Sequence, residues 1–365
     1  MLLLAACGGA GAPAGPPSVS RVAVASPAAA ASLPPQPSSS SQPNAGLKTI
    51  HIGTIATISQ SPLLIAQKRG YFASAGMDAE VTPLKSGVDA IPLLATGQID
   101  VGTGVSPSVA WFNALQRGLT IKAVAPNAVD SADRPWAGGL AIAAKQATPV
   151  ASLKDLKTPV RIASTGPDTL PGGLTLLLAR RDGVPESSLS FTTMGLADMV
   201  PALANGSIDV ATLAEPFLTN GEKNGSLKRW VSYNDLAPNV AVSAVLYGKN
   251  FLQDRDAGAR FMEAWLRGVR DYEDAIETGR DLAEIESIIG GPTNTPPAVF
   301  EQMSRSHTIS WMPPDGSIDV KPWSTVVDVW KSHGLIPNDV QAEALVDSSF
   351  AAQASAKLGP YQARR

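Results

Sequence analysis

Residues 91–104 read IPLLATGQIDVGTG, and residues 200–213 read VPALANGSIDVATL. Aligned without gaps, at an offset of 109 residues, the two stretches share eight positions, including the core Gly-x-Ile-Asp-Val. Each copy predicts a short apolar helix that ends at a glycine, followed by a buried strand that starts at Ile-Asp-Val. The offset is far longer than the roughly 20 to 50 residues of a solenoid repeat, so we interpret the duplication as two similar α/β lobes.

The composition narrows the class of protein. A length of 365 residues suits two domains or two lobes of one domain, and a hydrophobic content of 44% is ample for a core. The net charge of −3 and the pI near 5.7 argue against a general nucleic-acid-binding surface, which would be basic. The one cysteine, Cys7, excludes an internal disulfide and a cysteine-based metal site.

The N-terminus resembles a lipoprotein signal. Residues 4–7 read LAAC, which is similar to the lipobox of bacterial lipoproteins, where the chain is cut before a cysteine that is then lipidated. We therefore interpret residues 1–7 as the remnant of a signal and Cys7 as the lipidation site that anchors the protein to a membrane. Because only six residues precede Cys7, we expect the natural start to lie upstream. An apolar start without function is the alternative.

Residues 8–46 are rich in Ala, Pro, Ser and Gly. Such a composition cannot build a core, so we expect a disordered tether between the anchor and the folded part. No later apolar run reaches the roughly 18 residues that a membrane-spanning helix needs. Together, the anchor and the tether predict an extracytoplasmic protein, in the periplasm or on the outer face of the cell membrane.

Short β-branched runs alternate with apolar helical segments from residue 49 to residue 247. This alternation predicts parallel α/β sheets in two series, the second beginning near residue 152. From residue 254 onward the pattern is helical and amphipathic. The expected strands are 49–56, 78–84, 101–104, 121–125, 139–144, 160–164, 189–193, 209–213, 230–233 and 240–247, and the expected C-terminal helices are 257–276, 282–289, 297–306, 325–333 and 340–356.

Several of these segments resemble one known family. AQKRGYFASAGMDAEV (residues 66–81), SLKDLKTPVRIAS (residues 152–164), both Gly-x-Ile-Asp-Val turns and the Glu-Pro after the second turn are similar to the extracytoplasmic solute-binding proteins of ABC importers. The branch that they resemble handles sulfonates, taurine, nitrate and thiamin-pyrimidine precursors. The resemblance covers most of residues 49–250, whereas the C-terminal third is generic.

The resemblance implies a two-lobed type 2 periplasmic-binding-protein fold, an α/β fold with a mixed sheet in each lobe and two crossing hinge strands. On this chain the crossings fall near residues 137–142 and 240–245. Lobe 1 then comprises residues 47–137 and 246–365, and lobe 2 comprises residues 138–245. The family also implies a monomer that binds a small-molecule ligand between its lobes and delivers it to an ABC permease and ATPase complex, with no nucleic-acid partner.

Polar loops follow the predicted strands where a ligand would bind. In open α/β sheets the ligand lies beyond the carboxyl ends of the strands, near helix N-termini. Helix-start N–H groups and hydroxyls suit a sulfonate, a carboxylate or another oxyanion without a cationic partner. The alternative is that each Ser or Thr only caps a helix. The candidate ligand-binding residues are Ser59, Gln60, Ser61, Ser86, Gly87, Gly104, Ser106, Thr165, Thr169, Glu215 and Trp136.

Five charged or aromatic residues allow two interpretations each. Glu215 pairs with an amine or aromatic N–H of the ligand, or it caps its own helix. Trp136 stacks on a ring-bearing ligand, or it is a surface or hinge aromatic. Arg134 is the nearest cationic candidate for an anion, or it is a solvated loop residue. Asp100 and Asp209 suggest catalysis at first, but their matched places in the two copies favour turn or capping roles.

The sequence favours a binding protein over an enzyme. Pyrimidine synthases that resemble this family use a lysine-bound cofactor, histidines and a cysteine cluster, whereas this chain has only His51, His307 and His333 and a single cysteine. No nucleophile motif, phosphate loop or metal cluster stands out, so we expect no cofactor and no metal. The alternatives are a ligand-sensing module for a signalling partner and an enzyme on the same scaffold.

Overall fold

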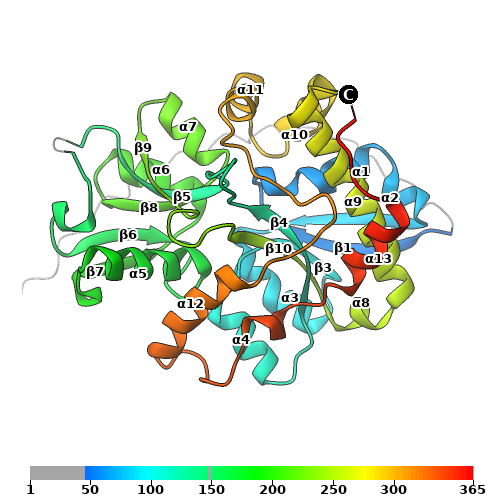
Figure 1. Ribbon diagram of the computed structural model, residues 1–365, viewed down its shortest axis with the longest axis horizontal. Coiled ribbons are helices and arrows are strands. Elements are labelled where there is room, and N and C mark those ends of the chain that lie inside the picture. The colour runs from blue at the N-terminus through cyan, green and yellow to red at the C-terminus, as the bar shows by residue number, and fades with distance from the viewer. Residues whose placement is uncertain (1–45, 147–148, 365) are drawn as a thin grey trace, which may run out of the picture. The chain divides into compact units, whose positions relative to one another are not determined.

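Two five-stranded sheets organise the protein, as the computed structural model shows for residues 46–146 and 149–364 (Figure 1). Cys7 and residues 8–45 of the expected tether lie outside the described residues. The first sheet has the order β2-β1-β3-β10-β4 and the second has the order β7-β6-β8-β5-β9. The strands are β1 (Lys48–Thr54), β2 (Met77–Pro83), β3 (Val101–Val105), β4 (Lys122–Val129), β5 (Gly138–Ala143), β6 (Val160–Ser164), β7 (Leu189–Thr193), β8 (Val210–Ala214), β9 (Leu227–Ser232) and β10 (Ala241–Tyr247).

Both sheets are mixed, in the same way. The first three strands of each order run parallel, and the fourth, β10 or β5, runs antiparallel to both of its neighbours. The chain enters β5 from β4 of the first sheet, and it enters β10 from β9 of the second sheet, so each of these strands follows a crossing between the sheets. These mixed sheets confirm the expected α/β class. The expected end of lobe 2, at residue 245, falls inside β10, and this whole strand pairs within the first sheet.

The duplicated stretch forms the same unit in both sheets. α3 (Ala90–Thr96) leads into β3, and α6 (Leu196–Ala204) leads into β8. The glycine between helix and strand has a left-handed backbone in each copy, with φ of 72° at Gly97 and 74° at Gly206, a conformation that favours glycine. β3 then pairs with β1, and β8 pairs with β6, both in parallel. The sequence prediction of two equivalent helix-glycine-strand units is therefore confirmed.

Helices cover both sheets, and the longest, α9, forms the centre of an apolar core with the first sheet (Figure 1). Phe261, Trp265, Val269 and Tyr272 of α9 are all buried, as their helical spacing predicts. The other helices are α1 (Ser61–Lys68), α2 (Tyr71–Ser74), α4 (Val109–Gln116), α5 (Leu170–Asp182), α7 (Phe217–Lys223), α8 (Lys249–Gln253), α9 (Arg255–Thr278), α10 (Leu282–Gly290), α11 (Pro297–Arg305), α12 (Lys321–Ser332) and α13 (Ser349–Leu358).

The C-terminal helices contact elements of both sheets. Trp323 of α12 lies 6.3 Å from Trp111 of α4, measured between ring centroids, in an edge-on arrangement. On its other side α12 packs against α5 so closely that a Cβ added at Gly173 would lie 2.2 Å from Val326. α11 reaches the second sheet as well, because the carbonyl of Ala298 accepts a hydrogen bond from Lys223 of α7. The C-terminal third thus belongs structurally to both halves.

One expected helix differs from the structure. The segment expected as a helix over residues 340–356 contains a short 3-10 turn (η5, Ala342–Leu345), and α13 begins only at Ser349. Between them Val346 forms a parallel bridge with Ala123 of β4, and the Asp347 amide donates to the Ala123 carbonyl at 2.8 Å. This backbone pairing with the sheet requires an extended chain, which interrupts the helix.

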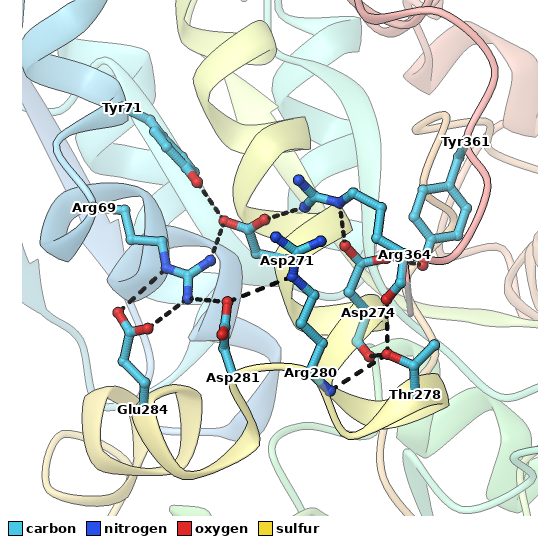
Figure 2. Close-up of polar contacts among 10 residues, drawn as sticks. All are labelled: Arg69, Tyr71, Asp271, Asp274, Thr278, Arg280, Asp281, Glu284, Tyr361 and Arg364. Carbon is cyan, nitrogen blue, oxygen red and sulfur yellow. Dashed lines mark hydrogen bonds and ion pairs between the residues drawn. The ribbon is translucent and has the colours of Figure 1, made fainter.

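After α13 the chain is held against α9 by charged side chains (Figure 2). Arg364 pairs with Asp271 and Asp274, each at 2.5 Å, and the Tyr361 hydroxyl lies 3.0 Å from Asp274. Arg69, the residue after α1, pairs with the other carboxylate oxygen of Asp271 at 2.8 Å.

In the part of the chain that the structure describes, no helix has both the length and the apolar character needed to cross a membrane.

Candidate ligand-binding site

A cavity lies between the loops at the carboxyl ends of the two sheets. Thr57, Ser59 and Ser86 line it from the first sheet, and Thr165 and Glu215 line it from the second. This is the place at which an open α/β sheet binds its ligand. Of the eleven candidate residues, seven line this cavity: Ser59, Ser86, Gly87, Gly104, Ser106, Thr165 and Glu215.

The remaining four candidates are not among the lining residues. The Ser61 hydroxyl donates to the Ile58 carbonyl at 2.6 Å, and the Thr169 hydroxyl donates to the Gly166 carbonyl at 2.6 Å, so both serve local turns. Gln60 is buried in the short turn before α1. Trp136 stacks beside Arg229, with the guanidinium carbon 5.3 Å from the ring centroid.

Two glycines let the backbones at the cavity wall approach closely. Gly104, in β3, has φ of 73°, and a Cβ there would lie 2.7 Å from Ile55. A Cβ at Gly87 would lie 2.5 Å from the carbonyl oxygen of Gly104. A side chain at Gly87 would push the Gly87 turn away from β3, and a side chain at Gly104 would clash with Ile55, which explains glycine at both.

Backbone hydrogen bonds join the two sheets on both sides of the cavity. The amide of Ile58 donates to the carbonyl of Glu215 at 3.2 Å. Farther along, the amide of Val109 donates to Asp168 at 2.9 Å and that of Leu170 donates to Pro107 at 2.8 Å. The structure therefore represents a state in which the loops of the two sheets touch.

Glu215 lines the cavity, but protein groups engage its carboxylate. Oε2 accepts from the Thr219 amide at 3.1 Å, and Oε1 accepts from the Thr219 hydroxyl at 2.8 Å and from Arg229 at 2.5 Å. Arg229 pairs in turn with Glu222 at 2.8 Å. Burial raises the pKa of Glu215 above its ordinary value, and the positive charge of Arg229 opposes this rise. Of the two interpretations of Glu215, these contacts support the helix cap.

Arg134 and the two repeated aspartates also have structural partners. Arg134 is buried and pairs with Glu273 at 2.8 Å, away from the cavity lining. Asp100 accepts from the His51 amide at 2.9 Å, and Asp209 accepts from the Arg161 amide at 2.8 Å. The two aspartates thus tie the start of β3 to β1 and the start of β8 to β6 in the same way, which confirms their predicted turn role.

The sequence reasoning missed two polar lining residues from the second sheet, Thr212 and Tyr233. Thr212 is the counterpart of Thr103 in the duplicated stretch, so the repeat itself was an available signal. Tyr233 follows β9 and is 1% exposed. No local pattern distinguishes it from a core tyrosine.

Within residues 46–146 and 149–364, no three or more His, Cys, Asp or Glu side chains are grouped to hold a metal ion. His51 lies beside Glu80, 3.3 Å away, and His333 contacts Glu186. Neither histidine lines the cavity.

The fold is that of the periplasmic binding proteins, as three solved structures show. The periplasmic nitrate-binding protein NrtA from Synechocystis PCC 6803 matches with a TM-score of 0.71 at 15% identity, over 86% of this chain and 89% of that chain. The alkanesulfonate-binding protein SsuA from Xanthomonas axonopodis pv. citri, bound to MOPS, matches with 0.65 at 19%, over 83% and 99%. A Candida albicans protein described as exhibiting the generic periplasmic binding protein fold matches with 0.61 at 16%, over 83% and 97%.

The sequence itself identifies the family. The chain belongs to the family described as NMT1/THI5 like, which it matches over residues 57–277. This range contains both copies of the duplicated stretch and all of the second sheet. Among curated proteins, no sequence matches the chain.

Proposed function

We propose that this protein is the substrate-binding component of an ABC-type importer, which captures a small organic solute in the cavity and delivers it to a permease. The cavity supports this proposal, because loops at the carboxyl ends of both sheets line it. A solute that contacts both sets of loops favours the closed arrangement, and hinge closure of this kind is a common ligand response. In this proposal one closing lobe comprises residues 47–137 and 241–365, and the other comprises residues 138–240, because β10 pairs within the first sheet.

The proposed role is binding without catalysis. Among the cavity-lining residues that the structure describes, the titratable side chains are Glu215 and Tyr233, and Glu215 is already paired. A general acid or base needs an atom that is free to donate or accept a proton within reach of the substrate. The solved relatives that are described as nitrate-binding and alkanesulfonate-binding support the same role.

A thermal-shift screen of the purified protein tests this function. The compounds are alkanesulfonates, nitrate, carboxylic acids, amides and pyrimidines. A ligand of the native state raises the melting temperature by mass action, with about 2.7 kcal/mol of added stability at 100 times its Kd. A compound that shifts the melting temperature and saturates in calorimetry supports the proposal. Turnover of a bound compound would instead indicate an enzyme.

We further propose that Cys7 carries a lipid that holds the protein on the outer face of the cell membrane. In its native cells, the full-length Cys7→Ala protein should move from the membrane fraction to the soluble extracytoplasmic fraction. Ser18→Ala, in the same Pro/Ser-rich segment, serves as the control and should leave the protein in the membrane fraction. Retention of the Cys7→Ala protein on the membrane contradicts the anchor.

A further inference from the structure

The described residues that line the cavity include no lysine, arginine or histidine. Much of the wall is apolar, with Ile55, Val88, Leu196, Leu213 and Val242 among its members. The polar lining side chains are mainly hydroxyls. An anionic ligand would therefore lose its hydration without meeting a cationic side chain in the lining, which is costly in an apolar site, and the one carboxylate that a cationic ligand would meet, Glu215, is already paired with Arg229.

The cation closest to the lining residues is Arg229, which pairs with the lining residue Glu215 but is not itself a lining residue. It lies between two carboxylates, at 2.5 Å from Glu215 and 2.8 Å from Glu222. Two negative charges around one positive charge leave this group negative overall when both carboxylates are ionised. In that state the group repels an anionic solute, even though the Arg229 Nη1 is buried without a hydrogen-bond partner.

Three backbone donors beside the cavity are also occupied. Free N–H groups at helix starts are the usual means of binding an oxyanion without a cation. Here the amides of Ile58 and Leu170, which begin helical segments, donate to the carbonyls of Glu215 and Pro107, each in a loop of the other sheet. The amide of Gly104 donates to the Asn127 side chain. These three amides are therefore not available to an oxyanion.

One hydroxyl from the second sheet is left for a ligand. Thr212 is 1% exposed, and apart from the Tyr233 hydroxyl, which also lines the cavity, its Oγ1 has no hydrogen-bond partner. In the first sheet the equivalent Thr103 donates to Thr54 at 2.6 Å. The second sheet has Ser164 in place of Thr54, and the Ser164 hydroxyl donates to the Gly166 carbonyl at 3.0 Å instead. The duplication therefore shows directly which partner Thr212 lacks.

The first sheet contributes a similar group. Ser86 lines the cavity, and its buried Oγ has no partner other than the Asp89 amide of its own capping box, which leaves the hydroxyl proton for a ligand. A hydroxyl can both donate and accept, so the two groups match a ligand that carries donors and acceptors without a charge.

We propose that this cavity takes an uncharged solute with an apolar body and one or two hydrogen-bonding groups, such as an amide, that meet Thr212 and Ser86. The proposal rests on the solute-binding function proposed above and specifies its substrate class. It separates this chain from the relatives described as nitrate-binding and alkanesulfonate-binding.

Matched pairs of compounds test the proposal, because each pair shares a body and differs in charge. The pairs are benzamide and benzoate, 1-butanesulfonamide and 1-butanesulfonate, and nicotinamide and nicotinate, measured by thermal shift and calorimetry on the purified protein. We expect the uncharged member of at least one pair to bind ten or more times more tightly than its anion. Equal or tighter binding of the anions overturns the proposal.

Two valine variants test the role of the free hydroxyl. Thr212→Val keeps the side-chain shape and should weaken the best uncharged probe about tenfold, because a hydrogen bond to the ligand is lost. Thr103→Val is the matched control, since the Thr103 hydroxyl is already paired with Thr54, and it should change probe affinity less than twofold. Unchanged affinity in Thr212→Val contradicts the role of this hydroxyl.

If no compound pair shifts the melting temperature, native mass spectrometry of the protein purified from its native cells identifies the compound that it retains. The charge of that compound then tests the proposal. A retained uncharged compound supports the proposal. A retained anion overturns the proposal and leaves the solute-binding function intact. Absence of any retained compound contradicts both.

Discussion

At the scale of single residues, Glu215 shows how a lining residue can be structural. Its side chain is fully buried, and both carboxylate oxygens have protein donors. Ion pairs of this kind are costly to break, because the remaining partner keeps a buried charge without compensation. Glu215 thus fixes the start of α7 and the position of Arg229, which in turn stacks on Trp136.

Glu215→Gln should lower the free energy of unfolding by about 2–3 kcal/mol, because Arg229 loses its buried charged partner and keeps only Glu222. Chemical denaturation at neutral pH measures this change. Glu222→Gln is the control, since the Glu222 side chain is 33% exposed, and it should cost less than about 1 kcal/mol. Equal losses in the two variants would show that burial of the pair contributes nothing.

At the scale of elements, the duplicated turn and the C-terminal segment are held by different means. In the duplicated turn, Asp100 and Asp209 accept from backbone amides of the neighbouring strand, so each contact is local to its sheet. The C-terminal segment is held by side chains far apart in sequence. Asp274 of α9 has a side chain that is 2% exposed, and Arg364 and Tyr361 reach it from the end of the chain (Figure 2).

Arg364→Ala should destabilise the protein by about 1–2 kcal/mol, because the buried Asp274 carboxylate loses its cation while Arg364 itself is half-exposed. The loss should become smaller when Asp274 is already changed to Asn, and a double-mutant cycle on the unfolding free energy measures this coupling. Arg305→Ala removes an ion pair from a side chain that is 78% exposed and should have almost no effect. Additive effects of Arg364→Ala and Asp274→Asn contradict the coupling.

At the scale of the whole molecule, the C-terminal part links the two sheets outside the two crossings. α12 packs on α5 of the second half, and its end is joined to the same half by His333. The His333 Nδ1 lies 2.7 Å from the Val329 carbonyl, and Nε2 faces the Glu186 carboxylate. Because both ring nitrogens face acceptors, the imidazolium form satisfies both contacts, which raises the pKa of His333 above its ordinary value.

This contact predicts a pH dependence of stability. A raised pKa in the folded state adds stability that is fully present below the unfolded pKa of about 6.5 and is lost as the pH rises through the folded value. The side chains are 32% and 29% exposed, so we expect a loss of about 0.5–1 kcal/mol between pH 6 and pH 9. Unfolding curves of wild type and His333→Gln across this range measure it. The variant should lack this part of the dependence, and identical pH profiles contradict the assignment.

The sequence by itself determined the repeated helix-glycine-strand unit, most strands, the α/β class and the loops in which a cavity forms. These features depend on glycine conformation and on the spacing of apolar residues over a few positions, which the sequence displays directly. Seven of the eleven candidate residues line the cavity for the same reason, since they follow strands that could be recognised.

Only the tertiary structure decided which polar groups near the cavity are already paired. Glu215 is engaged by Arg229, 14 positions away, and the amide of Ile58 is engaged by Glu215 from the other sheet. The position of α12 on α5 and the surroundings of the Thr212 hydroxyl also depend on the tertiary structure. A hydrogen bond or ion pair depends on where distant segments meet, and this placement depends on the packing of the whole core. The local sequence pattern therefore does not predict which distant segments meet.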